Sequence, residues 1–335
     1  MAGSGAPNPR PRTEAFENAP SFFPLRNHSA APARSVGRDS SHAGVVRVTG
    51  ARVLTAALLI PLVVFAVLWT DTWVIAGLVA AVVILCLHEF FRLGAAAGAG
   101  GDPRWTTVCA LLLVGLQCLE SSHQGRWMRS EFGLLYSPDR TPLPPEMALA
   151  VFILGAGALA VAGRARLKEA IPRLGVNCAA MLLVALPLSF LVRLYGMDPL
   201  GPRIVLFLLI LLWVGDTLAY FTGRSVGRHK MAPELSPGKT WEGTTANLLG
   251  SILVGLASAR WIALPPVHLM VMAGLANVAG QLGDLTESAY KRSAGVKDSG
   301  ALLPGHGGML DRVDSLIFAA PVVWYYFRIL LPAVG

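Results

Sequence analysis

The sequence predicts an all-α fold, a polytopic transmembrane helical bundle of about nine spans joined by polar cytosolic loops. Hydrophobic residues make up 54% of the 335 residues and charged residues only 14%, whereas soluble domains carry about 25% charged residues. The apolar residues gather in runs near the length that crosses a bilayer. Most connections between runs are too short to hold a second domain, so a single bundle is expected.

Residues 1–52 come first and show no apolar periodicity. They hold seven arginines, no lysine, three acids and six of the prolines, which predicts a disordered basic tail. A secretory signal peptide is not expected, because the first apolar run begins late and lacks a cleavage pattern; an organelle transit segment stays an alternative. Residues 53–335 are expected to form one membrane-embedded domain.

The apolar runs give the expected helices in order. Inside lipid only a helix satisfies its backbone hydrogen bonds without water, so each run is predicted to be helical. The runs are 53–69, 73–91, 105–119, 147–163, 175–192, 204–222, 245–263, 267–284 and 314–333. The first two can instead form a tight hairpin with Asp71 at its tip.

The distribution of basic residues predicts the orientation. With nine spans and the tail in the cytosol, cytosolic segments hold 21 of the 28 Lys and Arg residues. Such a bias marks the cytosolic side of a membrane protein. The polar segments 223–244 and 285–313 then both lie in the cytosol, where nucleotides are found.

An acid inside an apolar run is the first functional signal. Asp216 follows ten strongly apolar positions and one glycine, and a carboxylate at the bilayer centre costs roughly 2.5–3.5 kcal/mol on insertion scales. Asp216 therefore needs a partner, a cavity or a role, unless it ends its helix at the interface.

The eighth run carries a polar stripe at steps of four, three and four residues, which shares one helical face. Its members are Asn277, Gln281, Asp284 and Ser288. Hydrogen bonding between helices explains Asn277 and Gln281 well. It explains poorly why Asp284 and Glu287 are added to them.

The segment from Ser288 to Asp314 is rich in charges and glycines. The glycines around His306 can take positive φ and bring backbone N–H groups close to a phosphate, although an ordinary flexible turn stays an alternative. Asp311 and Asp314, three apart at the start of the last run, are predicted to aim their carboxylates the same way.

Several acids and lysines in these segments suit magnesium-dependent nucleotide chemistry, because Mg²⁺ prefers oxygen ligands and often shares them with phosphates. The candidate oxygen ligands are Asp216, Asp284, Asp311 and Asp314. The lysines that would neutralise a polyphosphate are Lys230, Lys239, Lys291 and Lys297.

The other cytosolic segment contains Ser236-Pro-Gly-Lys-Thr-Trp-Glu-Gly243. Its Gly-Lys-Thr triplet is not a P-loop, because the position five residues before Gly238 is Pro233 and no strand is expected before it. Holding phosphates stays plausible chemistry for this triplet.

Taken together, these segments resemble the phosphatidate cytidylyltransferase (CDP-diacylglycerol synthase) family. The resemblance covers about residues 213–315 and rests on a long, specific pattern; Tyr290 departs from it, because an aliphatic residue or Phe is usual there. The matching motifs are Asp216-Thr-x-Ala-Tyr220, Ser236-Pro-x-Lys-Thr-x-Glu-Gly243, Gly283-Asp-Leu-x-Glu-Ser288, Ser288-x-x-Lys-Arg292, Lys297-Asp-x-Gly300 and Pro304-Gly-His-Gly-Gly-x-x-Asp-Arg-x-Asp314.

The resemblance implies transfer of a cytidylyl group from CTP to phosphatidic acid, giving CDP-diacylglycerol and pyrophosphate. It also implies a requirement for Mg²⁺, with a second cation, monovalent or divalent, left open. A homodimer in a bilayer is expected, in the bacterial inner membrane with the N-terminus and active site cytoplasmic. No nucleic acid is expected as a partner.

The expected site residues divide by role. Metal ligands are Asp284 and Asp311, implied by the resemblance, with Asp216 and Asp314 as further ligands or supports. Residues expected to hold CTP are Ser236, Lys239, Thr240, Glu242, Gly307 and Gly308. Residues expected to act on the triphosphate or the lipid phosphate are Lys239, Lys291, Arg292 and Lys297, with Asp314. His306 is expected either to donate to the leaving pyrophosphate or to stabilise its turn.

Two other functions are weighed against this one. A CTP-dependent kinase of lipid alcohols would share the helices and acids but would release CDP. An ion-coupled transporter would use Asp216 and Asp284 for its coupling ion. It also predicts inverted repeats, which the sequence does not show.

Overall fold

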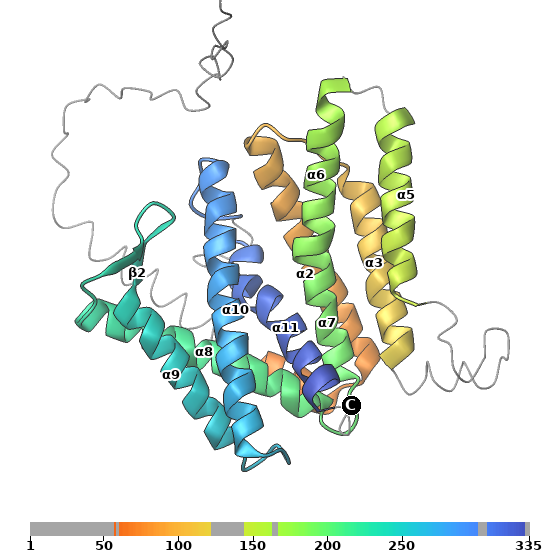
Figure 1. The fold of residues 1–335 in the computed structure, drawn as a ribbon. Helices are drawn as coiled ribbons and strands as arrows, with labels where there is room; N and C mark the ends of the chain where they lie inside the picture. Colours follow the sequence, from red (N-terminus) through yellow and green to blue (C-terminus); the bar gives the residue numbers. More distant parts are fainter. Residues whose placement is uncertain (1–56, 58–59, 122–143, 163–166, 301–306, 332–335) are drawn as a thin grey trace, which may run out of the picture. The chain divides into compact units, whose positions relative to one another are not determined.

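The structure is a computed structural model that describes residues 57, 60–121, 144–162, 167–300 and 307–331. The predicted tail 1–52 and His306 lie outside these residues. The helices, shown in Figure 1, are Ile60–Trp69, α2 (Thr72–Ala96), α3 (Pro103–Ser121), α5 (Glu146–Ala162), η1 (Leu167–Glu169), α6 (Ala170–Ala180), η2 (Met181–Ala185), α7 (Leu186–Tyr195), α8 (Gly201–Ser225), α9 (Trp241–Ser258), α10 (Pro266–Ser293) and α11 (Leu310–Leu330).

The order of the helices confirms the order of the apolar runs. Helices α6, η2 and α7 continue one another, so that Ala170–Tyr195 is a single long apolar helix. Its middle is a π-helical segment just before Pro187, which lacks the N–H needed for a regular helical hydrogen bond.

Four of the described helices are long and apolar enough to cross a membrane: α2, Ala170–Tyr195, α8 and α11. Large apolar side chains also face outward, among them Val161, which is 89% exposed, and Leu154, which is 74% exposed. In water such surfaces would be costly, and this indicates a membrane protein. The finer expectation of nine spans stays a prediction, since α9 and α10 carry the polar residues of the site.

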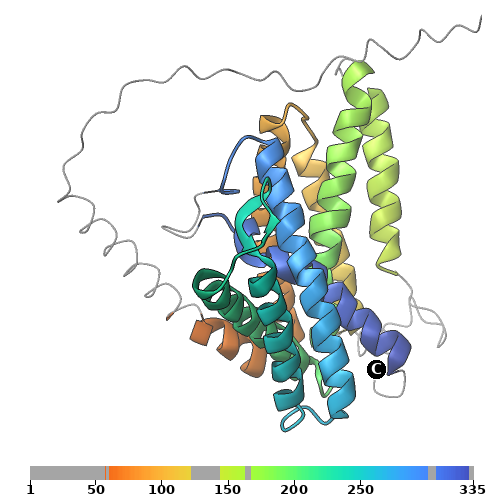
Figure 2. The ribbon, with the colours of Figure 1, turned by 60° about the vertical axis from the view of Figure 1, so that its left-hand side comes forward.

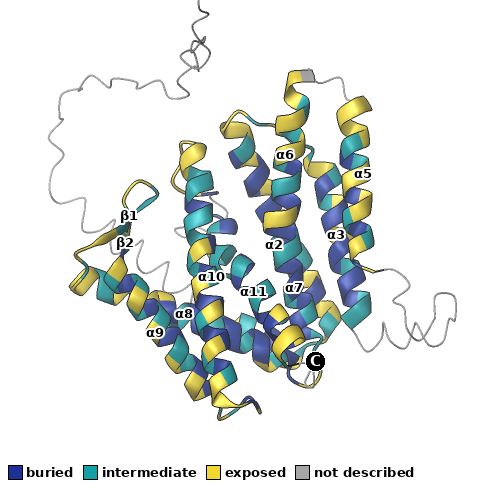
Figure 3. Cartoon of the chain, in the orientation of Figure 1, coloured by how far each residue is buried: buried dark blue, intermediate teal, exposed yellow. Residues whose placement is uncertain are grey.

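Two sets of neighbouring helices share the core. Helices α2, α3, α5 and the α6–α7 rod pack side by side, while α8 packs on α9, α9 on α10 and α10 on α11. Figure 2 shows α9 and α10 lying along each other. Helix α11 also packs on α7 and so joins the sets. Buried residues line the faces that the helices turn toward one another (Figure 3).

Glycines allow the site helices to approach closely. A Cβ on Gly215 of α8 would lie 2.0 Å from Oδ1 of Asn247, and one on Gly283 of α10 would lie 2.4 Å from the backbone oxygen of Asp314. Small residues are the usual means of bringing membrane helices together. These contacts bring the acids of α8, α10 and α11 near one another.

Gly283→Ala is expected to lower the thermal midpoint of the detergent-solubilised protein. The added methyl meets backbone, which cannot rotate away, and such overpacking typically costs about 1–3 kcal/mol. The control is Gly77→Ala in α2, where nothing lies within 4 Å of the new Cβ. Equal midpoints in the two variants would show that the α10–α11 contact is not tight.

The segment between α8 and α9 corrects the expectation of a wholly helical fold. It contains β1 (Lys230–Ala232) and β2 (Ser236–Thr240), which pair antiparallel with Lys230 opposite Thr240. Strand β2 ends at Thr240, which is also the N-cap of α9 and accepts from the N–H of Gly243 at 3.2 Å. The hairpin therefore places Lys239 one residue before that cap.

Candidate active site

Three predicted acids converge from three helices. Asp284 of α10 pairs with Lys239 of β2, with Nζ and Oδ2 2.7 Å apart. Asp216 of α8 and Asp314 of α11 lie within electrostatic range of Asp284 and of each other. We call Asp216, Asp284 and Asp314 the acid cluster; Lys239 is its counter-charge.

A chain of hydrogen-bonded polar side chains runs from this cluster along the contact between α9 and α10. Asn247 of α9 donates to Asp216 at 3.1 Å, and Asn277 of α10 donates to Asn247 and, at 2.8 Å, to Ser251. Gln281 donates to Asn277 at 2.6 Å within α10 and to the backbone oxygen of Thr244 of α9 at 3.4 Å. Asn277 and Gln281 therefore bond helices together, which confirms that interpretation for them, whereas Asp284 belongs to the acid cluster.

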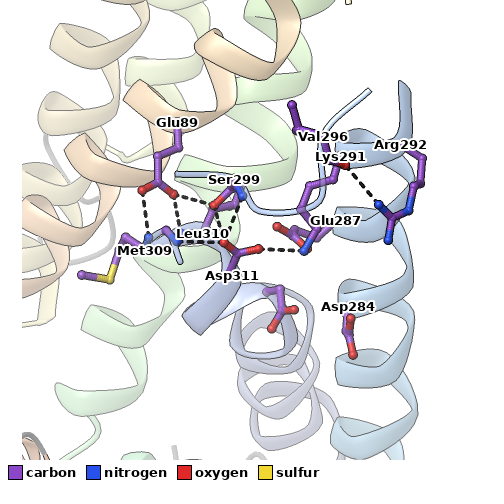
Figure 4. A network of polar contacts seen from close by, with 12 residues as sticks. Glu89, Asp284, Glu287, Lys291, Arg292, Val296, Ser299, Met309, Leu310 and Asp311 are labelled. Atoms are coloured by element: carbon purple, nitrogen blue, oxygen red, sulfur yellow. Dashed lines mark hydrogen bonds and ion pairs between the residues drawn. The ribbon is translucent and has the colours of Figure 1, made fainter. Parts of the chain in front are cut away.

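Lys291 of α10 lies between two further acids. Its Nζ is 2.7 Å from Oδ1 of Asp311 and also contacts Glu287. All three side chains are largely buried: Lys291 is 13% exposed, Asp311 10% and Glu287 4%. Burial raises the pKa of the Glu287 carboxyl to about 8, although Lys291 opposes this. Figure 4 draws the contact between Lys291 and Asp311 and draws none to Asp284.

Asp311 also organises the backbone before α11. Its Oδ2 accepts from the N–H of Ser299 at 3.0 Å, from the Ser299 hydroxyl at 2.9 Å and from the N–H of Gly308 at 2.8 Å. Gly307 beside it has φ +77, a conformation that favours glycine. In this structure the Gly308 N–H, predicted to face CTP, is bonded to Asp311.

Sequence reasoning missed Glu89 of α2. This side chain is 4% exposed, and its carboxylate accepts from Met309 N–H at 2.9 Å, Leu310 N–H at 2.8 Å and the Ser299 hydroxyl at 2.8 Å. These bonds are drawn in Figure 4. An acid within the apolar run 73–91 was the available signal, the same one that marked Asp216.

The remaining predicted residues lie around the hairpin and the end of α10. Arg292 donates to the backbone oxygens of Leu235 at 3.1 Å and Val296 at 3.2 Å, which ties the hairpin to α10. Glu242 accepts from the ring of His229 at 2.7 Å. Hydrogen bonds from its own backbone and from His229 lower the pKa of Glu242 to about 2.

Ser236 and Lys297 are described without a polar contact that assigns them a role. Ser236 is partly buried at the start of β2, and Lys297 is exposed on the turn after α10. The structure therefore brings together Lys239 with the acid cluster, and Lys291 with Asp311. Among the described residues, no hydrogen bond or ion pair joins Lys297 to either group.

Comparison with known proteins places the sequence in a family. The sequence model of the cytidylyltransferase family matches residues 50–330, which include all the helices of the site. The chain belongs to the cytidylyltransferase family.

Named relatives support the assignment. A Synechocystis sp. protein named phosphatidate cytidylyltransferase is 32% identical over 296 residues, which are 85% of this chain and 98% of that protein. Proteins of the same name from Haemophilus influenzae and Staphylococcus epidermidis are 43% identical over 144 residues and 46% over 125. The matches cover 50% and 48% of those two relatives, about half of their length.

The residues of this cytidylyltransferase-family chain can be tested against the expected Mg²⁺. In the part of the chain that the structure describes, no group of three His, Cys, Asp or Glu side chains is placed to hold a metal. The acid cluster nevertheless supplies carboxylate oxygens from three helices, the donor type that Mg²⁺ prefers, and it already attracts the ammonium of Lys239. The donor set therefore fits the ion.

Asp311 fits a metal less directly. One of its oxygens faces Lys291, and the other accepts from Ser299 and Gly308. Metal binding by Asp311 stays a prediction, and it requires at least one of these contacts to be exchanged.

Proposed function

We propose that this protein transfers a cytidylyl group from CTP to phosphatidic acid. A phosphate oxygen of the lipid attacks the α-phosphorus of CTP, the bond from that phosphorus to the bridging oxygen breaks, and pyrophosphate leaves. The observation that carries the proposal is the ion pair of Asp284 with Lys239, with Asp216 and Asp314 close enough to interact with Asp284, in a chain of the cytidylyltransferase family.

The main barrier to this reaction is repulsion between two polyanions. The lipid phosphate is already an anionic nucleophile, so the protein needs no strong base and acts by positioning and by supplying positive charge. We assign Lys239 to the CTP phosphates, because it ends the hairpin and lies 2.7 Å from Asp284. Ser236 and Thr240 flank it on the same strand.

Bound Mg²⁺ would supply further positive charge beside the triphosphate. Asp284, with Asp216 and Asp314, would hold it. Lys291 and Asp311 form a well-packed pair next to this cluster, and Lys291 also lies within electrostatic range of Asp314. We assign the pair the shaping of the backbone before α11, with metal binding by Asp311 as a further prediction. Arg292 holds the hairpin against α10, while Lys297, which is exposed, is assigned to the lipid phosphate.

The membrane, the orientation and the partners of the protein are proposed on separate grounds. The excess of Lys and Arg in alternate loops favours a cytoplasmic N-terminus and a cytoplasmic site. Bacterial relatives favour the inner membrane. A homodimer, a second cation and the absence of a nucleic-acid partner are carried over from the family resemblance and from the sequence.

Purified protein incubated with α-labelled CTP and phosphatidic acid is expected to form a labelled CDP-lipid and pyrophosphate in equal amounts. A lipid-alcohol kinase would instead release labelled CDP when diacylglycerol is offered. An ion-coupled transporter would show no turnover with either lipid. Either of these results would overturn the proposal, and omission of phosphatidic acid is the control.

A further inference from the structure

The carboxylate of Glu89 is enclosed by the backbone that it binds. A Cβ on Gly300 would lie 2.6 Å from Oε1 of Glu89, and one on Gly308 would lie 2.3 Å from Oε2. Real Cβ atoms do not approach so closely, so both positions need glycine for this carboxylate to fit. Gly300 and Gly308, which both lie between α10 and α11, therefore pack against a side chain from α2.

Glu89 and Asp311 share the donors at the start of α11. Glu89 takes the N–H groups of Met309 and Leu310, and Asp311 takes that of Gly308. These N–H groups lack hydrogen-bond partners within α11. The positive end of the helix dipole also lies here and attracts acids. The two carboxylates therefore fix where α11 begins.

Ser299 connects the two acids directly. Its hydroxyl lies 2.8 Å from Oε2 of Glu89 and 2.9 Å from Oδ2 of Asp311. The other oxygen of Asp311 faces Lys291. A single path of contacts therefore runs from Glu89 through Ser299 and Asp311 to Lys291.

We infer that Glu89 is a positioning residue of the reaction, acting through Ser299 and Asp311 on the segment before α11. The inference rests on the proposed cytidylyl transfer. Glu89 itself reaches neither the acid cluster nor Lys239 by any contact between described residues. Its role is to hold the backbone from which Asp311 and Asp314 project.

The test is Glu89→Gln in the purified full-length chain. No orientation of the amide can accept from both Met309 and Leu310, because one oxygen becomes an NH₂ donor. We expect kcat to fall about 10–100-fold, the scale of a small misplacement of reacting groups, while KM for CTP stays within about twofold. Hydrogen exchange at the Met309 and Leu310 amides should become faster.

Matched variants separate positioning from folding. Glu169→Gln makes the same chemical change at an exposed residue and should leave kcat, thermal midpoint and exchange unchanged. Ser299→Ala should also lower kcat, and the double variant Glu89→Gln/Ser299→Ala should lose less than the product of the two single losses. If Glu89→Gln does not accumulate as folded protein, Ser299→Ala carries the test.

The possible results distinguish failure of the positioning role of Glu89 from failure of the proposed function. Wild-type protein that turns over CTP beside a Glu89→Gln variant with normal kcat would overturn the inference alone. A kcat that falls only in step with the thermal midpoint, or fully independent losses in the double variant, would also overturn it. Wild-type protein with no turnover would remove the proposed function, and the positioning role with it.

Discussion

Asp284→Asn is expected to reduce CTP incorporation into lipid by roughly 100-fold or more, the scale of losing one main charge-stabilising group. The amide keeps the size of the side chain but removes the negative charge that faces Lys239 and that would hold a cation. Because the Asp284–Lys239 pair is partly exposed, the variant should fold normally. The measurement is initial rate per amount of folded protein.

The control for this prediction is Asp71→Asn. Asp71 is exposed before α2 and makes no side-chain cap to that helix, so its variant should keep normal turnover. Near-normal CTP incorporation by Asp284→Asn would remove Asp284 from the proposed metal site.

Lys291→Met is expected to lower the thermal midpoint strongly and to abolish most activity. The change leaves the Asp311 carboxylate without its cation beside Glu287, and breaking a buried ion pair in this way costs roughly 3–5 kcal/mol. Lys168→Met, at an exposed position, should change neither property. Thermal unfolding in detergent, followed by fluorescence, measures the difference.

A second substitution tests the cause of that loss. Adding Asp311→Asn to Lys291→Met removes one uncompensated charge, so part of the thermal midpoint should return while activity stays low. A midpoint that does not rise, or falls further, would show that Lys291 stabilises the fold by packing and not by neutralising acids.

Much of the fold could be predicted because the lipid environment determines which backbone structure an apolar run can form. Apolar runs must become helices in lipid, and their order along the chain is the order of the helices. The hairpin at 230–240 was missed because Pro233 and Pro237 hide any strand pattern and no alternation marks β2. Its pairing depends on the ends of α8 and α10, which local sequence does not reveal.

Part of the candidate site could also be predicted, because polar groups are costly in lipid. Asp216 and Asp284 are conspicuous because an acid in or beside an apolar run is costly, and the structure brings them together. Asp284 and Asp311 were expected as joint metal ligands, whereas the structure gives each its own lysine; their metal roles stay predictions. Glu89 was missed because its partners lie in distant sequence.

That distance affects how the protein is made. Glu89 leaves the ribosome in α2, 210 residues before Ser299 and 221 before Leu310. Until those residues arrive, an apolar helix carries a carboxylate without its final donors, at an insertion cost of roughly 2.5–3.5 kcal/mol if it reaches the bilayer centre. The start of α11 supplies those donors, so a helix made late in synthesis secures one made more than 200 residues earlier.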